Sequence, residues 1–342
     1  MGALIHRRCI ALYSGGLDSI LAIKVMEGQG FDVIPLFFCT PFAGLPALLD
    51  PDAFVERHQR LYGVKVRIID YTEDLTAIIK APRHGFGRHM NPCIDCKIGM
   101  LKRARDLLDE TRSSFVITGE VLGQRPMSQR RTILPVIERA SGLEGLLLRP
   151  LCARHLPMTI PEHQGLVDRE ALWDIRGRGR TVQIERAASY GITGDTVPTP
   201  AGGCLLTDRQ ISRRVRDTFD RVSPGLPTKA DLLLDVVGRR FRLDSHTILV
   251  VGRNDEENRI LETFTDPGNV FLAIEDVPGP LCVIRGNAGQ EQLRLAAGIC
   301  LRYGKARGSQ GRQAAYGVNP SALDGSIQAP VLSDDFCRSL QD

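Results

Sequence analysis

The sequence predicts an α/β protein whose first two thirds form a doubly wound, mostly parallel sheet, followed by a smaller α+β domain. Four short apolar runs are candidate strands, at residues 9–13, 33–39, 64–71 and 115–118. Helical patterns separate them, at residues 20–27, 52–61 and 97–109. Strands that alternate with helices form parallel sheets. Because such sheets bind ligands beyond the carboxyl ends of their strands, we expect the functional site in the residues that follow each expected strand.

Composition places the chain among soluble globular proteins. It has 342 residues, of which 43% are hydrophobic and 25% charged, and its net charge is +4. No stretch approaches the roughly 20 apolar residues of a membrane span, so we expect a cytoplasmic protein with no membrane partner. The net charge is too small to establish a nucleic-acid partner by itself.

The turn after the first expected strand has the composition of an anion site. It reads Ser14-Gly15-Gly16-Leu17-Asp18-Ser19 and leads into the first expected helix. Two glycines allow a sharp turn, and the hydroxyls of Ser14 and Ser19 join the backbone N–H groups of a helix N-terminus as donors. An acidic residue among these donors, Asp18, is explained if it holds Mg²⁺ or positions a nucleotide.

The strand at residues 115–118 leads into a second candidate loop, which runs from Thr118 to Gln124. Its glycines allow close backbone approach, and its polar side chains could contact a base or a ribose. We select Thr118, Gly119 and Gln124 as nucleotide-site candidates; an ordinary strand-to-helix turn is the alternative.

Three of the nine cysteines are candidates for chemistry. Cys93 and Cys96 form a CxxC pair at the start of an expected helix, and Cys204 lies in a loop rich in proline and glycine. Three thiolates suit an iron–sulfur cluster with one open coordination position, or zinc with a fourth ligand. The alternative is a thiol pair that forms a transient disulfide during sulfur transfer. His84 and His89 precede the pair and could supply a ligand or a proton, although each is more simply a loop histidine.

The pattern changes after residue 222. We expect a first domain at 1–222, a linker at 223–229, a second domain at 230–320 and a tail at 321–342. Short strands separated by turns are expected in the second domain, at residues 241–243, 247–252, 270–274 and 281–285.

Residues 9–220 resemble the PP-loop ATP pyrophosphatases, which have an adenine-nucleotide alpha-hydrolase-like fold. The SGGxDS turn carries this resemblance. Residues 117–129, with TGE-x-x-GQ and then SQ, and the RPL at 149–151 resemble the adenylation domain of 4-thiouridine tRNA sulfurtransferases. The cysteine arrangement is similar to that of tRNA 2-thiouridine synthases.

This resemblance implies ATP-dependent tRNA thiolation, in which a pyrimidine carbonyl oxygen is adenylated and sulfur then displaces AMP. It implies ATP and Mg²⁺ at Ser14, Gly15, Gly16, Asp18 and Ser19, with Thr118, Gly119 and Gln124 near the nucleotide. Cys93, Cys96 and Cys204 would be the catalytic residues and would hold a [4Fe-4S] or [3Fe-4S] cluster, with zinc as the alternative. The chain shows neither the RNA-binding region nor the rhodanese domain of the bacterial enzymes, so sulfur would come as sulfide or from a separate donor protein.

Residues 230–320 resemble the RNA-binding domain of the NFACT proteins, through VGRN at 251–254 and the PG turn at 278–279. The leading prediction is therefore a tRNA sulfurtransferase that has tRNA as its partner and that could form a homodimer. The RNA-binding candidates are the arginines Arg125, Arg130, Arg131, Arg209, Arg213, Arg253 and Arg285. Two alternatives stay open: a PP-loop ligase or amidase acting on a small molecule, and a non-enzymatic RNA-binding adaptor.

Overall fold

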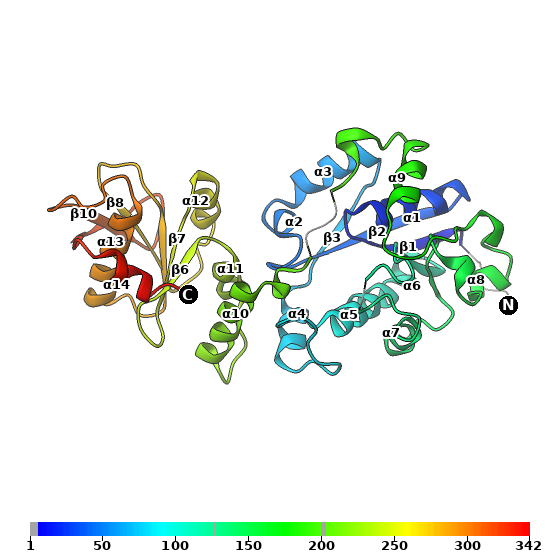
Figure 1. The fold of residues 1–342 in the computed structure, drawn as a ribbon, viewed down its shortest axis with the longest axis horizontal. Coiled ribbons are helices and arrows are strands. Elements are labelled where there is room, and N and C mark those ends of the chain that lie inside the picture. Colours follow the sequence, from blue (N-terminus) through cyan, green and yellow to red (C-terminus); the bar gives the residue numbers. More distant parts are fainter. Residues whose placement is uncertain (1–5, 126, 200–202) are drawn as a thin grey trace. The chain divides into compact units, whose positions relative to one another are not determined.

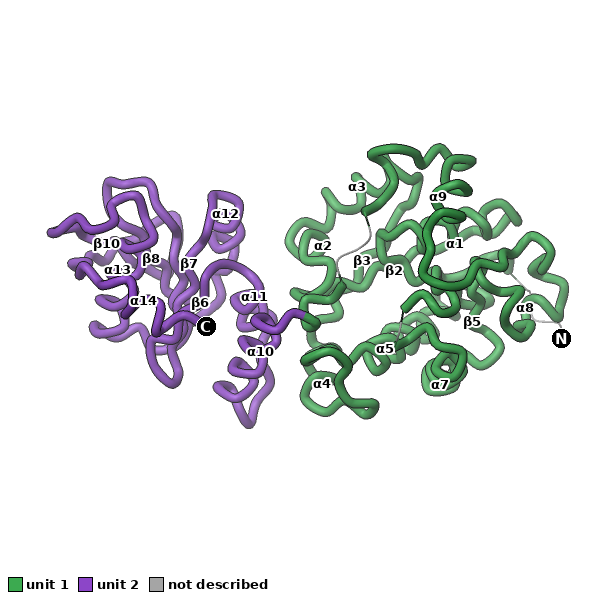
Figure 2. Tube along the Cα trace, viewed as in Figure 1, with its two compact units in different colours: residues 1–207 green, residues 208–342 purple. Residues whose placement is uncertain are grey.

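The structure is a computed structural model that describes residues 6–125, 127–199 and 203–342. Contacts divide the chain into two compact units, Met1–Thr207 and Asp208–Asp342 (Figure 2). None of the helices in the described ranges combines the length and apolar character needed to cross a bilayer.

The first unit contains the parallel sheet that the sequence predicts. Its five strands lie in the order β3-β2-β1-β4-β5, and every neighbouring pair is parallel. The strands are β1 (Arg8–Tyr13), β2 (Asp32–Cys39), β3 (Arg67–Asp70), β4 (Phe115–Thr118) and β5 (Leu147–Leu148). The chain reverses its winding direction at β1, so the loops after β1 and β4 meet at the switch point where such sheets bind ligands.

Helices cover both faces of this sheet (Figure 1). They are α1 (Leu17–Gly28), α2 (Leu45–Leu49), α3 (Pro51–Tyr62), α4 (Thr72–Lys80), α5 (Cys93–Asp106), α6 (Leu108–Thr111), α7 (Leu134–Ser141), α8 (Ile160–His163) and α9 (Thr181–Ala188). Short 3₁₀ turns lie at Ala153–His155, Arg169–Ala171, Gly194–Thr196 and Leu205–Thr207.

The side chains of β1 point alternately to the two faces of the sheet, which explains why helices pack on both faces. Cys9, Ala11 and Tyr13 belong to the apolar cluster that includes α1, whereas Ile10 and Leu12 belong to the cluster that includes α5 and α7. Successive side chains of a strand point to opposite faces, so a strand that is apolar throughout must be covered on both sides.

The second unit is α+β, as predicted, and its six-stranded antiparallel sheet has the order β11-β10-β8-β9-β7-β6. The strands are β6 (Arg239–Arg242), β7 (Ile248–Val251), β8 (Asn269–Ile274), β9 (Cys282–Arg285), β10 (Gln313–Gly317) and β11 (Gly325–Gln328). The helices are α10 (Arg209–Val222), α11 (Lys229–Val236), α12 (Asp255–Glu262), α13 (Gln290–Tyr303) and α14 (Asp334–Ser339). The expected tail thus contributes β11 and α14 to this unit.

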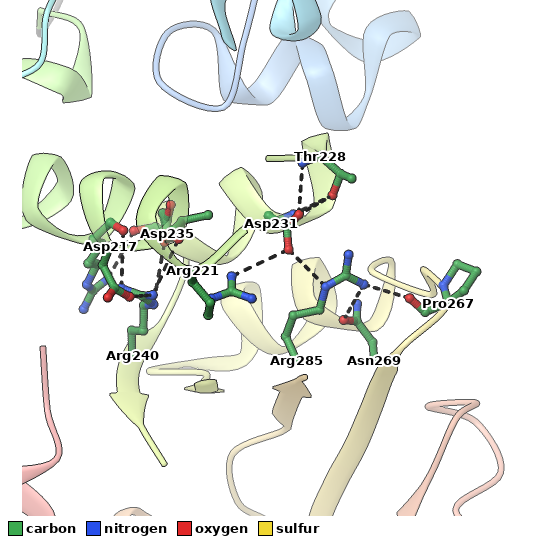
Figure 3. A network of polar contacts seen from close by, with 11 residues as sticks. Asp217, Arg221, Thr228, Asp231, Asp235, Arg240, Pro267, Asn269 and Arg285 are labelled. Carbon is green, nitrogen blue, oxygen red and sulfur yellow. Dashed lines mark hydrogen bonds and ion pairs between the residues drawn. The ribbon is translucent and has the colours of Figure 1, made fainter. Parts of the chain in front are cut away.

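A buried ionic network joins α10 and α11 to β6 (Figure 3). Arg240 on β6 is fully buried and forms ion pairs with Asp217 of α10, Asp235 of α11 and Asp342. Thr218 donates a hydrogen bond to Asp235 over 3.0 Å. The second compact unit therefore begins before α10, upstream of the linker expected at 223–229.

Candidate nucleotide and thiol site

The turn between β1 and α1 is closed by its two serines. The Ser19 hydroxyl donates to the Gly16 carbonyl over 2.8 Å and accepts from the backbone N–H of Ser14 over 3.2 Å. Gly15 has a φ of +73°, which L side chains rarely adopt. Helix α1 begins at Leu17 with no side chain capping it, so its first N–H groups are available to an anion.

The loop after β4 packs directly on this turn. A Cβ on Gly119 would lie 2.5 Å from the Asp18 carbonyl carbon and oxygen and 2.6 Å from the Ser19 nitrogen, so only glycine allows this approach. Gln124 donates from Nε2 to Asp18 Oδ2 over 2.9 Å. The other carboxylate oxygen of Asp18 is buried without a hydrogen-bond partner in the described chain, as a site for a cation or a donor would require. The structure thus brings together the candidates of both loops.

Thr118 is placed differently from the open loop residues. It is buried, and its hydroxyl donates to Glu120 Oε2 over 3.1 Å. Its contact with a nucleotide stays a prediction.

Sequence reasoning missed the buried network around Glu120. Arg149 Nε lies 3.2 Å from Glu120 Oε2, Lys97 Nζ lies 3.5 Å from Oε1, and Arg149 also pairs with Glu138. Burial by itself would raise the pKa of Glu120, but Lys97 and Arg149 hold that pKa below its usual value. Because Lys97 follows Cys96, the network connects the nucleotide loop to the helix that carries the CxxC pair.

His58 is a second residue that sequence reasoning missed. It stacks on Phe54 with ring centroids 4.1 Å apart, and its Nδ1 lies 2.6 Å from the Tyr13 hydroxyl. A Cβ on Gly15 would lie 3.2 Å from the His58 ring, so this imidazole supports the turn from behind. Burial and then Arg57 lower the pKa of His58 to about 4, so it is neutral at pH 7.

The three candidate cysteines are electrostatic neighbours. Cys93 and Cys96 lie in the first turn of α5. The backbone N–H of Leu205 donates to the Phe42 carbonyl over 2.9 Å, and this hydrogen bond holds the neighbouring Cys204 beside the loop after β2. Burial is the main cause that raises the pKa of Cys96 to about 12, and the neighbouring Cys204 and Cys93 add to it. Burial, with a further contribution from Cys93, raises the pKa of Cys204 to about 11. All three are free and partly exposed.

This grouping is looser than a single-ion site. Within the described ranges, no three His, Cys, Asp or Glu side chains form a group that could hold one metal ion. A cluster binds its thiolates through different iron atoms, so its cysteine ligands do not have to meet at one metal ion. The His84 Nδ1 lies 2.7 Å from Oδ1 of Asp95, the residue directly before Cys96. His89 has a φ of +55°.

The candidate RNA-binding arginines differ in availability. Five of them have no ion pair among the described residues and are exposed: Arg125, Arg130, Arg131, Arg209 and Arg213. Arg253 is paired with Glu257. Arg285 is paired with Asp231 and donates to the Pro267 carbonyl over 2.8 Å (Figure 3). RNA contact through either of these last two would require an internal bond to be given up.

Fold and site define a PP-loop-like α/β unit followed by an α+β unit. Residues 5–155 match the family model described as thiamine biosynthesis protein (ThiI), and residues 238–338 match the model described as NFACT protein RNA binding domain. These matches confirm the resemblance to the 4-thiouridine tRNA sulfurtransferases and the resemblance to the NFACT RNA-binding domain.

The individual proteins that resemble this chain have low sequence identity to it. A probable tRNA sulfurtransferase of Thermococcus kodakarensis is 28% identical to this chain over 148 aligned residues. The aligned part makes up 42% of this chain and 36% of that protein's length. A 4-thiouridine synthetase in complex with RNA and bound ATP is 18% identical, with a TM-score of 0.37 over 59% of this chain and 42% of that one. The U34-tRNA thiolase NcsA of Methanococcus maripaludis with its [4Fe-4S] cluster is 17% identical, with a TM-score of 0.31 over 66% of this chain and 69% of that one.

Proposed function

We propose that this chain is an ATP-dependent tRNA thiolase. It adenylates a carbonyl oxygen of a tRNA pyrimidine and releases pyrophosphate; sulfide then attacks the same carbon, and AMP leaves with the original oxygen. The observation that carries this proposal is that the Asp18 turn and the Gly119 loop follow β1 and β4 and pack on each other, while Leu205, next to Cys204, is hydrogen-bonded to Phe42 in the loop after β2. The match to the ThiI model and the name of the Thermococcus relative support the choice of reaction.

The nucleotide part of the proposal assigns ATP to the two packed loops. The backbone N–H groups of Gly15 and Gly16 would donate to phosphate oxygens at the N-terminus of α1. The hydroxyls of Ser14 and Ser19 now donate within the turn, and they would exchange these bonds for bonds to phosphate. Asp18 would hold Mg²⁺ through the oxygen that has no partner, while Gln124 fixes the orientation of its carboxylate. Charge neutralisation and orientation of the leaving pyrophosphate are the main catalytic requirements.

The thiol part assigns an iron–sulfur cluster to Cys93, Cys96 and Cys204. With three cysteine ligands the cluster would leave one iron position open, and its chemistry when bound would be to present sulfide. The protein would contribute burial of the thiols and the Lys97 ammonium beside them.

The test is anaerobic incubation of the purified protein with ATP, Mg²⁺, sulfide and unmodified bulk tRNA, followed by mass spectrometry of nucleosides. We expect a thiolated pyrimidine that is lost in Cys93→Ala and in Cys204→Ala. Cys282→Ala is the matched control, because this cysteine is buried in the second unit and should leave the product unchanged.

Pyrophosphate release separates the two halves of the reaction. Asp18→Ala should reduce it roughly 100-fold or more, as removal of a group that stabilises transition-state charge does. A protein that makes no thionucleoside, and whose pyrophosphate release survives the cysteine substitutions but depends on ammonia, would be a small-molecule ligase or amidase. Full function in Asp18→Ala would instead identify an RNA-binding adaptor.

A further inference from the structure

An arginine-rich segment, residues 176–180, lies along the nucleotide loop although it is far from that loop in the sequence. It reads Arg176-Gly177-Arg178-Gly179-Arg180. The Gly177 nitrogen donates to the Leu122 carbonyl over 2.8 Å, and Leu122 and Arg176 form a parallel β-bridge. The nucleotide loop therefore has this segment bonded to its side.

The same segment also approaches the chain that leads to Cys204. Arg180 Nη2 donates to the Pro198 carbonyl over 3.0 Å. Upstream, the nitrogens of Trp173 and Ile175 donate to the carbonyls of Pro150 and Leu151, each over 2.9 Å. Backbone hydrogen bonds therefore hold one end of the segment at Leu122, and the Arg180 side chain holds the other end at Pro198.

Its first two arginines are free to bind a partner. Arg176 and Arg178 are exposed, and neither forms an ion pair with any residue in the described ranges. Arg125, Arg130 and Arg131 on the neighbouring loop share both properties. Five exposed arginines without a carboxylate partner in the described ranges therefore lie either directly after the nucleotide loop or on the segment bonded to it. We call these five residues the arginine rim.

The surface beside the segment is open. Among the residues that the structure describes, no atom lies within 4 Å of a Cβ placed on Gly177 or on Gly179. A planar guanidinium donates two parallel hydrogen bonds to a phosphate, and a row of them neutralises a polyanion that passes by.

We propose that Arg176 and Arg178, with the rest of the arginine rim, bind the sugar-phosphate backbone of the RNA substrate and hold the target base at the nucleotide loop. This inference rests on the proposed function and adds Arg176 and Arg178, which no sequence motif selected, to the RNA-binding candidates. The rim positions the RNA by charge and does not read its sequence, because phosphate contacts carry no sequence information.

The test measures the affinity of the full-length protein for unmodified tRNA at several KCl concentrations. In the Arg176→Ala/Arg178→Ala variant we expect affinity at 100 mM KCl to fall roughly 10-fold or more, and the slope of log K against log[KCl] to become shallower by about 1.5, as loss of two phosphate contacts requires. Affinity for Mg²⁺–ATP in the absence of tRNA should stay unchanged, because neither arginine belongs to the turn assigned to ATP.

Two variants control for folding and for net charge. Arg176→Lys/Arg178→Lys keeps the charges and should restore most of the salt slope. Lys102→Ala/Arg103→Ala removes two exposed charges from α5 and should leave tRNA affinity at the wild-type value.

The outcomes separate this inference from the proposed function. A wild-type affinity and salt slope in the alanine variant overturn the inference while the thiolase proposal stands. The same loss in the Lys102→Ala/Arg103→Ala variant also overturns it, because the effect would then be one of net charge. A wild-type protein that binds no tRNA at any salt concentration overturns both.

Discussion

At the scale of the residue, His58 illustrates how burial determines charge beside the candidate site. Its ring packs between Phe54 and the Gly15 turn and faces the Tyr13 hydroxyl. The folded protein therefore keeps this imidazole neutral, whereas the unfolded chain protonates it near pH 6.5.

This difference predicts a loss of stability in acid. The folded-state pKa of about 4 lies below the unfolded value, so His58 leaves the free energy of unfolding unaffected above pH 6.5 and lowers it as the pH falls from 6.5 to 4. The loss should reach about 2 to 3 kcal/mol. Urea unfolding followed by the fluorescence of Trp173, the single tryptophan, measures it in the first unit.

His58→Gln is the comparison for this measurement. It removes the titrating group, so its stability should depend less on pH between 6.5 and 4 than that of the wild type. Parallel curves for the two proteins would contradict the prediction.

At the scale of the element, the loops after β1 and β4 form one structure because Gly119 allows their backbones to touch. Gly119→Ala places a methyl group within 2.6 Å of three backbone atoms of Asp18 and Ser19. We expect the loops to separate and affinity for Mg²⁺–ATP to fall roughly 10- to 100-fold, as small misplacements in a site do. Isothermal titration calorimetry measures the change.

Gly28→Ala is the matched control. Gly28 ends α1, and nothing lies within 4 Å of a Cβ placed there. This substitution should leave ATP affinity unchanged and stabilise the protein by about 0.5 to 1 kcal/mol. Equal affinities in the two variants would show that close packing of the loops is not needed for binding.

The sequence predicts the elements better than their contacts. Apolar runs and glycine-rich turns identified four of the five parallel strands, because runs of apolar side chains leave a local pattern. Strand β5 has two residues and leaves almost none. The pairing of Arg176 with Leu122, and of Arg149 with Glu120, joins residues far apart in the sequence, and periodicity contains no information about such contacts.

In the candidate site too, residues close in the sequence could be predicted to lie together, whereas contacts between distant elements could not. Ser14, Gly16, Asp18 and Ser19 are adjacent in the chain, so their grouping follows from one turn. By contrast, the expected role of Arg285 took no account of Asp231, which lies on another element and pairs with it. A charge run in a sequence does not reveal whether a carboxylate already neutralises it.

At the scale of the whole molecule, each unit has its own core. The second unit packs α13 and α14 residues against its antiparallel sheet, and Arg240 lies buried among Asp217, Asp235 and Asp342. The ionic network makes α10 part of that unit's structure.

We therefore predict that a fragment of residues 208–342 is more stable than a fragment of residues 223–342. The shorter fragment removes Asp217 and Thr218, which leaves Arg240 and Asp235 with fewer partners and should cost roughly 3 kcal/mol or more. Chemical denaturation followed by circular dichroism compares them. Equal stabilities would favour the division expected at 223–229.

The long separation between the thiols has a consequence for the newly made protein. Cys96 leaves the ribosome 108 residues before Cys204 does, since 204 − 96 = 108. At about 5 to 20 residues per second, the first two thiols wait roughly 5 to 20 s for the third. Throughout synthesis of that stretch, the CxxC pair is a two-thiol site without the Phe42–Leu205 contact that holds Cys204 in place. Loading of the proposed three-cysteine cluster would therefore follow synthesis of the first unit, because a chain stalled before residue 204 carries only two of the three proposed ligands.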